Sequence, residues 1–598
     1  MQLDSEIKAH KEYSQLIGKN IQETIDICSE RLSKNPNDLM SLLHLGRFAT
    51  KTHQYDLAYE FYKKASDTYP WDVLIKREFI FTLLKLENYV QAKKEILNIL
   101  DNYKSFKNIN KVNDIFDTLA TFLNNIFDDS MNCVKAFELS LKIFPEYLAG
   151  YTSYCSFMIG KLLELKYSKE VLNKAIKRFG KNNSEILRTL LKIKLKSREF
   201  SEADRLNTIF RKKYPECKAI LTYEQYDIDS ALGKVKNQIK FLENGLKNSE
   251  DFPMALNFYS IMDKNILKRY DLDYLIKKYV VLKENKTDDL IQRPNVLLKM
   301  NQICEVISRK YSTLKDYKNE IIYLRKSLDY MFERKWVTRI ENSPAIETAL
   351  PYTIKNSLQD KMTKIDSLNI KSQDAMKPIF IIGMPRSGTT LVEKIITYNS
   401  QIIALEETGL VPAYLKRLEA FKNPGSLYER YEEVYKLDGK NFTDKDLFNF
   451  NYIEVIIKEF PNAKFVHCVR DSKETICSIY RNRLDGISWS HSFDTIMKYY
   501  DQYLNIISEQ KRKFGKYIMD VEHTELVSEP EKATKKLFSF LELDWSKDCL
   551  KYYKNKDLFS QTVSQKQMRN GIDKKYLGKY KELDFLFENY LDKYSWLK

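Results

Sequence analysis

A short segment around residue 380 combines an apolar run, two glycines and hydroxyl side chains in an order that suits anion binding. Residues 379–382 are β-branched or aromatic and predict a buried strand. The run ends at Gly383, a second glycine follows at Gly388, and the apolar periodicity of a helix begins at Leu391. Because backbone N–H groups in a strand–loop–helix turn attract an anion, the segment predicts a phosphate-binding loop.

The end of this loop differs from that of the loops that act on ATP. In those loops the second glycine is followed by lysine and then by serine or threonine. In this chain Gly388 is followed by Thr389 and Thr390. The loop is therefore expected to hold a phosphate without acting on the γ-phosphate of a nucleoside triphosphate.

A second set of polar residues follows another predicted strand. Residues 464–469 predict a strand, Arg470 stands at its carboxyl end, and Ser478 lies on the helix expected next. Ligands of parallel sheets bind at the carboxyl ends of strands, so Arg470 and Ser478 can face the same crevice as the Gly383 loop. The planar guanidinium of arginine makes two-point contacts with phosphate. Two anion sites in one crevice indicate a nucleotide that is phosphorylated at two places.

The composition indicates a large and mainly helical protein. The 598 residues suffice for at least two domains, and 43% of them are hydrophobic and 30% charged. The net charge of +16 predicts a surface that attracts anions, such as nucleotides or sulfated or phosphorylated substrates. A lysine-rich, solvated surface without a specific partner is the alternative. We predict no nucleic-acid partner.

The eight cysteines are scattered and form no CxxC pair. This pattern is typical of free thiols in a reducing compartment rather than of disulfides or a zinc site. The first residues contain no apolar signal segment, and no stretch reaches the length of a membrane helix. We therefore predict a cytoplasmic protein with no metal site and no membrane span.

A repeat is visible in the N-terminal part of the chain. Tyr55 and Ala58 recur as Tyr89 and Ala92 after one period of 34 residues, which is the length of a tetratricopeptide repeat. Residues 20–220 resemble tetratricopeptide-repeat proteins. The resemblance implies a helical solenoid whose concave surface holds a peptide or another subunit. A solenoid without a bound partner is the alternative.

These patterns predict a multidomain chain. We expect an all-α tetratricopeptide-repeat solenoid over residues 1–220 and a further helical, repeat-like region over 221–340. Residues 341–375 contain prolines and a polar run and predict a linker. From 376 to 598 strands and helices alternate, which predicts an α/β domain with a P-loop-like turn and a mainly parallel sheet.

This C-terminal domain resembles sulfotransferases that use 3′-phosphoadenosine 5′-phosphosulfate as donor. It is most similar to the bacterial type fused to tetratricopeptide repeats and shares features with tyrosylprotein sulfotransferases. The resemblance rests on the Pro-Arg-Ser-Gly-Thr-Thr sequence of residues 385–390 and on Arg470 with Ser478 eight residues later. It implies that the loop holds the 5′-phosphosulfate and that Arg470 and Ser478 hold the 3′-phosphate. The loop residues expected to bind the donor are Arg386, Ser387, Gly388, Thr389 and Thr390.

Three further segments extend the resemblance. Glu406, Glu407 and Thr408 match the Glu-Glu-Thr of tyrosylprotein sulfotransferases, which implies that Glu407 is the general base. Lys445 matches the lysine that assists the departing sulfuryl group. The last segment matches a late donor-binding loop, whose expected contacts are Ser564, Gln567, Arg569 and Lys579.

Other residues compete for the role of base. Glu406 could serve instead of Glu407, and some sulfotransferases use a histidine, for which His491 and His523 are the candidates. His523 stands where relatives often have a tyrosine, which leaves the adenosine contact open. His467 lies inside a predicted strand and is expected to be a hydrogen-bonded core residue.

The expected chemistry follows from the charges. A sulfuryl group moves in line between two oxygens, so positioning and charge stabilisation carry the catalysis. We expect Arg386 to hold the bridging phosphate, Lys445 to neutralise the departing oxygen, and a buried Glu407 to take the proton of an acceptor hydroxyl. We also expect Asp471 to orient Arg470. A sulfonate carries less charge than a γ-phosphate, so no metal is demanded.

The sequence thus predicts a sulfotransferase that acts on a hydroxyl of a peptide tyrosine, a glycan or a small molecule, with repeats that bind a protein partner or the substrate. A nucleotide kinase is disfavoured because Thr389 replaces the lysine that it needs. A nucleotide-binding scaffold whose repeats mediate protein–protein interaction without catalysis remains the alternative.

Overall fold

The computed structural model describes most of the chain and divides it into two compact units. The first unit ends at Tyr154 and the second begins at Cys155. The description covers residues 21–597 except 215–223, 226–227, 230–231, 233, 248–250, 285–292, 335–349, 368–371, 399–400, 423, 483, 485–486, 555–570, 575–576 and 579.

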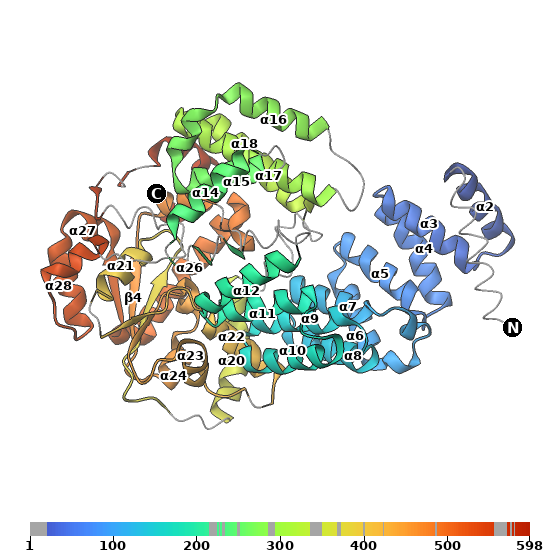
Figure 1. Cartoon of the computed structure of the whole chain (residues 1–598), viewed down its shortest axis with the longest axis horizontal. Helices are drawn as coiled ribbons and strands as arrows, with labels where there is room; N and C mark the ends of the chain where they lie inside the picture. The colour runs from blue at the N-terminus through green and yellow to red at the C-terminus, as the bar shows by residue number, and fades with distance from the viewer. Residues whose placement is uncertain are drawn as a thin grey trace. The chain divides into compact units, whose positions relative to one another are not determined.

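The first unit consists of paired helices (Figure 1). Its helices are α2 (Ile21–Lys34), α3 (Leu39–Lys51), α4 (Tyr55–Thr68), α5 (Val73–Lys85), α6 (Tyr89–Asn102), α7 (Ile115–Asn125) and α8 (Ser130–Ile143), and α9 (Leu148–Phe157) crosses into the second unit. The pair α5–α6 begins and ends 34 residues after the pair α3–α4. The predicted 34-residue period therefore corresponds to one pair of helices.

Close packing explains why a glycine and small alanines recur in these pairs. A Cβ atom on Gly46 would lie 2.7 Å from the ring of Tyr62, so only glycine lets α3 and α4 approach this closely. Ala58 and Ala92, one period apart, are both fully buried. Asp38 and Asp72 cap the first helix of each pair by accepting backbone N–H hydrogen bonds.

The second unit continues with helices and then changes to an α/β domain. Its helical region contains the π-helical turn η3 (Met158–Leu162), α10 (Leu165–Phe179), α11 (Ser184–Lys196), α12 (Phe200–Lys213), α14 (Val235–Leu246), α15 (Phe252–Met262), α16 (Leu272–Glu284), α17 (Arg293–Thr313) and α18 (Tyr317–Arg334). The segment expected to be a linker includes a helix, α20 (Pro351–Ser367), which packs against α22 (Leu410–Ala420) and α26 (Phe493–Phe514).

The sheet of the α/β domain is parallel throughout, as predicted. Its strands β1 (Ile379–Gly383), β2 (Ile403–Ala404), β3 (Phe442–Asp444), β4 (Lys464–Val469) and β5 (Ile518–Glu522) follow the order β2-β3-β1-β4-β5. The central strand β1 is buried along its whole length, which accounts for its unbroken apolar sequence. In the register of β1 with β4, Gly383 stands opposite Cys468. The segments that follow β1 and β4 therefore leave the sheet side by side.

Each face of this sheet has its own core. On one face, Ile381 and Val466 pack with α21 (Thr389–Ile396) and α28 (Pro530–Phe540). On the other, the ring of Phe380 stacks on Phe465 with centroids 5.4 Å apart and meets Phe442 edge-on. The remaining helices of the domain are α23 (Leu427–Tyr435), α24 (Ile453–Glu459), α25 (Ser472–Asn482) and α27 (His523–Ser528). The prediction of a helical region followed by an α/β domain is confirmed.

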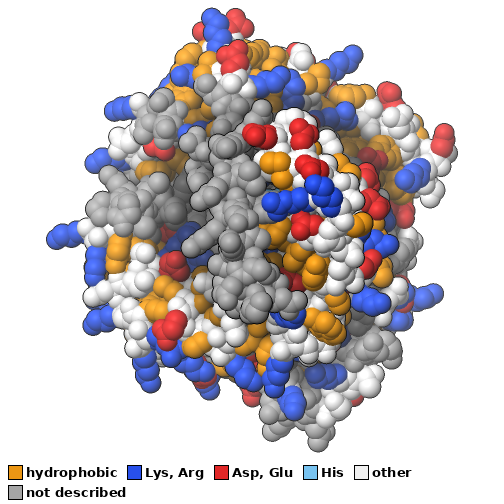
Figure 2. Space-filling view, turned by 90° about the vertical axis from the view of Figure 1, so that its right-hand side faces the viewer, with side chains coloured by type: hydrophobic (Ala, Val, Ile, Leu, Met, Phe, Trp, Pro, Cys, Tyr) orange, Lys and Arg blue, Asp and Glu red, His pale blue; other side chains and the backbone are white. Residues whose placement is uncertain are grey.

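Two further observations concern the charges on the surface and the predicted absence of a membrane span. Figure 2 shows one face of the molecule, on which Lys and Arg side chains are spread among Asp and Glu. None of the helices in the described part of the chain combines the length and the apolar character needed to cross a membrane.

Candidate functional site

The phosphate loop leaves β1 through a glycine that the fold requires. Gly383 has a φ of +140°, and a Cβ atom there would lie 2.7 Å from the backbone oxygen of Cys468. Gly388 has a φ of +104° and stands directly before α21. The predicted strand–loop–helix arrangement is present, and the N-terminus of α21 can contribute backbone donors to an anion.

The loop also presents a hydroxyl that the fold itself does not use. Ser387 is buried, and its Oγ has no hydrogen-bond partner among the described residues. Buried polar groups are normally hydrogen-bonded. An anion held by the loop would supply the missing partner, so this position fits a phosphate or sulfonate oxygen.

The two predicted anion sites lie together. The Arg386 Nε donates to Ser478 Oγ at 3.2 Å, and Arg470 Nη1 donates to the backbone oxygen of Arg386 at 3.0 Å. The hydroxyl of Tyr580 donates to the same Ser478 Oγ at 3.3 Å. Residues that follow β1 and β4, a residue of α25 and one of the C-terminal segment thus form one cluster. We call it the arginine cluster (Arg386, Arg470, Ser478 and Tyr580).

The charge of this cluster favours an anionic ligand. Burial lowers the pKa of the Arg386 guanidinium, and the neighbouring Arg470 acts in the same direction, while Tyr580 and a glutamate oppose them. Two guanidinium groups close together repel each other, and an anion beside them lowers that repulsion. The cluster therefore fits the phosphate groups of a nucleotide.

Arg470 is oriented by a residue that the sequence analysis did not single out. Its Nε and Nη2 donate to Glu474 Oε2 at 3.1 and 2.7 Å. Asp471, which we expected to do this, instead accepts the backbone N–H of Glu474 at 2.8 Å and so caps α25. Glu474 lies four residues after Arg470, a helical spacing that could have indicated the pair.

The predicted base and the predicted lysine are in direct contact. Lys445 Nζ donates to Glu407 Oε1 at 2.8 Å. The lysine side chain is fully buried at the end of β3, whereas 52% of the Glu407 side chain is exposed. The expectation that Glu407 is buried is therefore wrong, and its carboxylate is open to an incoming group.

Neighbouring carboxylates keep Lys445 charged. Burial by itself would lower the pKa of Lys445, but the carboxylates of Glu407 and Glu393 outweigh it and raise the pKa above its ordinary value. An ammonium held in this way is a point charge in a poorly solvated place. Such a charge stabilises a developing anion more strongly than it would in water.

The other candidate base is engaged elsewhere. Glu406 is buried, has a φ of +62°, and pairs with Lys394 of α21 at 3.4 Å. Its backbone N–H donates to Glu393 Oε1 at 3.2 Å. Glu406 therefore contacts α21, while Glu407 contacts Lys445 on β3.

Two aspartates that flank Lys445 were not predicted as part of the site. Asp444 accepts hydrogen bonds from the hydroxyls of Thr408, at 2.6 Å, and Tyr431. Asp446 is buried, and its burial together with Asp444 raises its pKa to about 7. Thr408, the threonine of the Glu-Glu-Thr segment, thus ties that segment to β3.

The histidines take different positions. His467 is a hydrogen-bonded core residue, as expected: its ring nitrogens lie 2.8 Å from Asp520 and 2.5 Å from the Tyr503 hydroxyl. His491 Nε2 lies 3.2 Å from the backbone oxygen of Leu484. His523 is buried next to Gly388, and its Nδ1 has no hydrogen-bond partner within the described residues.

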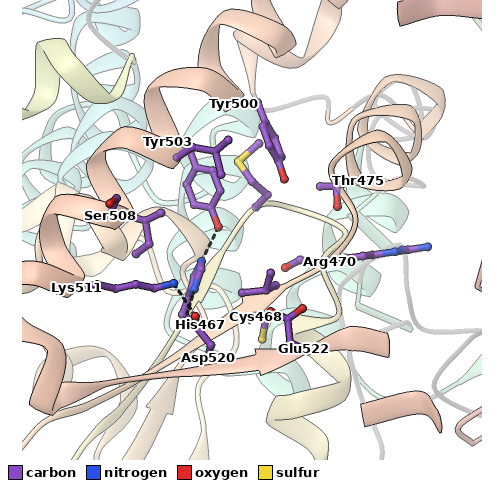
Figure 3. A pocket seen from close by; sticks show the side chains of 15 residues that line it. His467, Cys468, Arg470, Thr475, Tyr500, Tyr503, Ser508, Lys511, Asp520 and Glu522 are labelled. Carbon is purple, nitrogen blue, oxygen red and sulfur yellow. Dashed lines mark hydrogen bonds and ion pairs between the residues drawn. The ribbon is translucent and has the colours of Figure 1, made fainter. Parts of the chain in front are cut away.

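A pocket of about 370 Å³ borders the loop where β4, β5 and α26 meet. Figure 3 shows the Tyr503 hydroxyl pointing at His467 and Lys511 pointing at Asp520, with Arg470 on the far side. The Lys511 ammonium and Asp520 are 2.7 Å apart, so these polar groups largely satisfy one another. The pocket adjoins the arginine cluster through Arg470.

The late donor-binding residues cannot be placed in this site. Ser564, Gln567, Arg569 and Lys579 lie outside the described residues, and their roles stay predictions. Tyr580, the neighbour of Lys579, is described and belongs to the arginine cluster.

Comparison with known proteins agrees with this geometry. The model of the "Sulfotransferase family" matches residues 378–437 and 425–547, which include the loop, the Glu-Glu-Thr segment, Lys445 and Ser478. The C-terminal region is therefore similar to the sulfotransferase family.

Individual relatives match about a third of the chain. An uncharacterized protein of Aquifex aeolicus (strain VF5) is 29% identical over an alignment of 254 residues that covers 38% of this chain and 33% of that protein. A putative protein-tyrosine sulfotransferase of Caenorhabditis briggsae is 25% identical over 33% of this chain and 79% of its own length. Among solved structures, the sulfotransferase domain of the Synechococcus PCC 7002 olefin synthase has 18% identity and a TM-score of 0.28 over 36% of this chain and 89% of that chain. The chain thus spans about a third of the Aquifex protein that it matches.

Proposed function

We propose that this protein transfers a sulfuryl group from 3′-phosphoadenosine 5′-phosphosulfate to a hydroxyl acceptor. The observation that supports this most directly is the pairing of Lys445 with Glu407 at 2.8 Å in a domain that also contains the arginine cluster. The arginine cluster suits a donor with two phosphate positions. The half-exposed glutamate suits acceptance of a proton, and the lysine suits neutralisation of the charge on the leaving oxygen.

The proposed reaction uses these residues as follows. Glu407 accepts the proton of the acceptor hydroxyl while the acceptor oxygen bonds to the sulfur. The bond from sulfur to the bridging phosphate oxygen breaks, and its electron pair stays on that oxygen. Lys445 and Arg386 neutralise the charge that develops there. The products are a sulfate ester and 3′,5′-bisphosphoadenosine.

Arg470, Ser478 and the loop residues 387–390 are proposed to hold the donor. Backbone donors at the start of α21 would contact the 5′-phosphosulfate, and the guanidinium of Arg470 with the hydroxyl of Ser478 would contact the 3′-phosphate. His523, beside Gly388, would lie on the adenosine side. We propose that no metal takes part.

Nucleotide binding provides the first test. Calorimetric titration should show that 3′,5′-bisphosphoadenosine binds without Mg²⁺ and binds more tightly than ATP with Mg²⁺. A preference for ATP with Mg²⁺ would show that the proposed function is wrong. Transfer itself is tested with a radiolabelled sulfuryl donor against a tyrosine peptide, a glycan and a small phenol, which also identifies the acceptor class.

The alternative function is a nucleotide-binding scaffold. It predicts bisphosphate binding without transfer to any acceptor, and unchanged binding when Glu407 or Lys445 is replaced. The contact between those two residues favours the enzyme, since a scaffold has no need of a buried ammonium at this place.

We also propose that the first unit binds a peptide or protein partner and that the protein works in the cytoplasm. Leu57, Val90 and Met131 lie in the first turns of α4, α6 and α8, the second helices of successive pairs, and are 44%, 86% and 54% exposed. Val90→Asp should weaken partner capture without changing bisphosphate binding. The seven cysteines that the structure describes are buried and form no disulfide with one another, which suits a reducing compartment. Cell fractionation checks the location.

A further inference from the structure

Two contact zones join the helical region of the second unit to its α/β domain. The first, which we call the first seam, is formed by η3 and α10 against α22 and α23. The second seam is formed by α17 and α18 against α25. Each seam meets the domain next to a different part of the proposed site.

A buried charge pair forms the centre of the first seam. Glu164 forms an ion pair with Arg417 of α22, and both side chains are less than a tenth exposed. Arg430 of α23 lies 3.8 Å from the same carboxylate. The backbone N–H of Lys166 donates to Glu433 Oε1 at 3.1 Å. Breaking a buried pair leaves a charge without compensation, so this seam holds α22 in one position.

The first seam reaches the segment that carries the proposed base. The helix α22 begins at Leu410, three residues after Glu407. The turn between them passes Gly409, which has a φ of +66° and would place a Cβ atom 3.9 Å from Leu163 Cδ1. Leu163, next to Glu164, therefore lies beside the turn that connects Glu407 to α22.

The second seam is a two-point ion pair. Arg481 of α25 donates to the two oxygens of Glu320 at 2.5 and 3.0 Å and also to the hydroxyl of Ser312. The Glu320 side chain is only 4% exposed. Planar two-point contacts between arginine and carboxylate are strongly directional. The guanidinium of Arg481 is therefore held in a fixed orientation by α17 and α18.

From Arg481 the contacts continue into the arginine cluster. Its guanidinium lies 5.2 Å from the ring centroid of Tyr580, and the Tyr580 hydroxyl donates to Ser478 Oγ at 3.3 Å. Ser478 lies three residues before Arg481 on α25 and accepts from Arg386 at 3.2 Å. The second seam thus supports the hydroxyl that is proposed to meet the 3′-phosphate.

We propose that the helical region positions the residues of the transfer site. The first seam positions Glu407 for proton transfer. The second seam positions Ser478 and Tyr580 for donor binding. This inference rests on the proposed function. Glu164, Leu163, Glu320 and Arg481 act as positioning residues, because they reach the site only through other side chains.

Variants of the first seam are expected to change kcat, and variants of the second seam are expected to change the Kd of the donor product. Each set of variants therefore serves as a control for the other. Glu164→Gln should lower kcat about tenfold to a hundredfold, since misplacing a catalytic group costs rate. The Kd of 3′,5′-bisphosphoadenosine for this variant should stay within about twofold of wild type. Glu320→Gln should raise that Kd about tenfold, the equivalent of one lost charged contact, and leave the affinity for 5′-AMP unchanged.

A matched control separates positioning from general loss of stability. Glu305 of α17 is buried to a similar degree and pairs with Arg309 at 2.9 Å, and Arg309 also donates to Asn257 and Ser260 of α15. Glu305→Gln should lower the thermal midpoint to a similar extent and leave kcat and Kd unchanged. The proposal is overturned if Glu164→Gln and Glu320→Gln behave like this control, or if each of them both lowers kcat and raises Kd.

Milder variants cover the case in which the charge variants do not fold. Leu163→Ala should lower kcat, as expected for Glu164→Gln. Ser312→Ala should raise the Kd of the bisphosphate, as expected for Glu320→Gln. Amide hydrogen exchange at residues 405–410 gives a readout without activity: it should rise in Leu163→Ala and stay unchanged in Ser312→Ala. Unchanged exchange in Leu163→Ala would overturn the role of the first seam, whereas failure of the wild type to bind the bisphosphate would overturn the proposed function instead.

Discussion

The Lys445 ammonium and the Glu407 carboxylate lie 2.8 Å apart, and only the carboxylate is open to solvent. The lysine is fixed by burial and by the surrounding carboxylates, while the glutamate can meet an acceptor from outside. This asymmetry separates the two proposed roles: charge stabilisation belongs to the buried residue and proton acceptance to the exposed one.

Replacing Glu407 with glutamine removes the proton acceptor while keeping the shape of the side chain. Transfer should fall by about 10²–10⁴-fold, the usual contribution of a general base, and bisphosphate binding should stay near that of wild type. Steady-state transfer assays and calorimetry measure the two quantities. Glu406→Gln is the matched control, and full activity of Glu407→Gln together with an inactive Glu406→Gln would reverse the assignment.

Lys445→Met keeps the length of the side chain but removes its charge. We expect kcat to fall by about 10²–10³-fold, because the leaving oxygen loses its nearest buried cation. Calorimetry with bisphosphate and a thermal melt show whether the donor site and the fold persist. A variant that retains wild-type kcat would mean that another group neutralises the leaving oxygen.

Ser478→Ala tests the second anion site. The Kd of 3′,5′-bisphosphoadenosine should rise about tenfold, or about 1.4 kcal/mol, whereas the Kd of 5′-AMP should not change, since it lacks the 3′-phosphate. Ser539→Ala, at an exposed position of α28, is the control. Equal losses for both nucleotides would place Ser478 outside the 3′-phosphate contact.

His523 should make stability depend on pH. Burial, and to a smaller extent Arg470, lowers the pKa of His523 to about 4 in the folded protein. In the unfolded chain the pKa of His523 is about 6.5. Between about pH 6.5 and about pH 4 only the unfolded chain takes up the proton, so the free energy of unfolding falls as the pH falls. At about pH 5 the loss should be about 2 kcal/mol.

Thermal melts at about pH 8 and about pH 5 measure this effect. The midpoint of His523→Gln should fall less on acidification than that of wild type. The exposed His53 provides a control, since His53→Gln should behave like wild type. Identical pH dependence in wild type and His523→Gln would show that His523 is not held neutral.

Gly383→Ala should damage the loop through the backbone alone. The added Cβ atom would meet the backbone oxygen of Cys468 at 2.7 Å, in a conformation with φ +140° that side chains rarely adopt. We expect a loss of stability of about 1–3 kcal/mol and weaker bisphosphate binding, measured by denaturant titration and calorimetry. Gly515→Ala, where a Cβ atom meets nothing within 4 Å, should be neutral.

Local patterns predicted the parts of the site that lie close together in the chain. The glycines at 383 and 388 between a strand and a helix identified the loop, because such a turn needs positive φ angles and close approach of backbones. The 34-residue period identified the helix pairs, because each pair repeats the same packing of small and large residues.

Contacts between distant segments escaped these patterns. Tyr431 and Thr408 both donate to Asp444, and Tyr580 donates to Ser478 across 102 positions of the chain. The pairing of Glu474 with Arg470 was not predicted for a different reason. Charge pairs at helical spacing are common on any helix surface, so the spacing alone does not indicate a functional residue.

The sequence by itself determined the loop and the strand and helix types, because backbone conformation and hydrophobic periodicity depend on near neighbours. Its resemblance to sulfotransferases supplied the residues that we propose for sulfuryl transfer. Only the tertiary structure decided that Glu407 rather than Glu406 contacts Lys445, and that Glu164 and Glu320 of the helical region pair with Arg417 and Arg481 of the C-terminal domain. Those outcomes depend on which side chains meet after distant segments pack. Packing selects such partners by shape and by the cost of burying an unpaired charge, neither of which is visible along the chain.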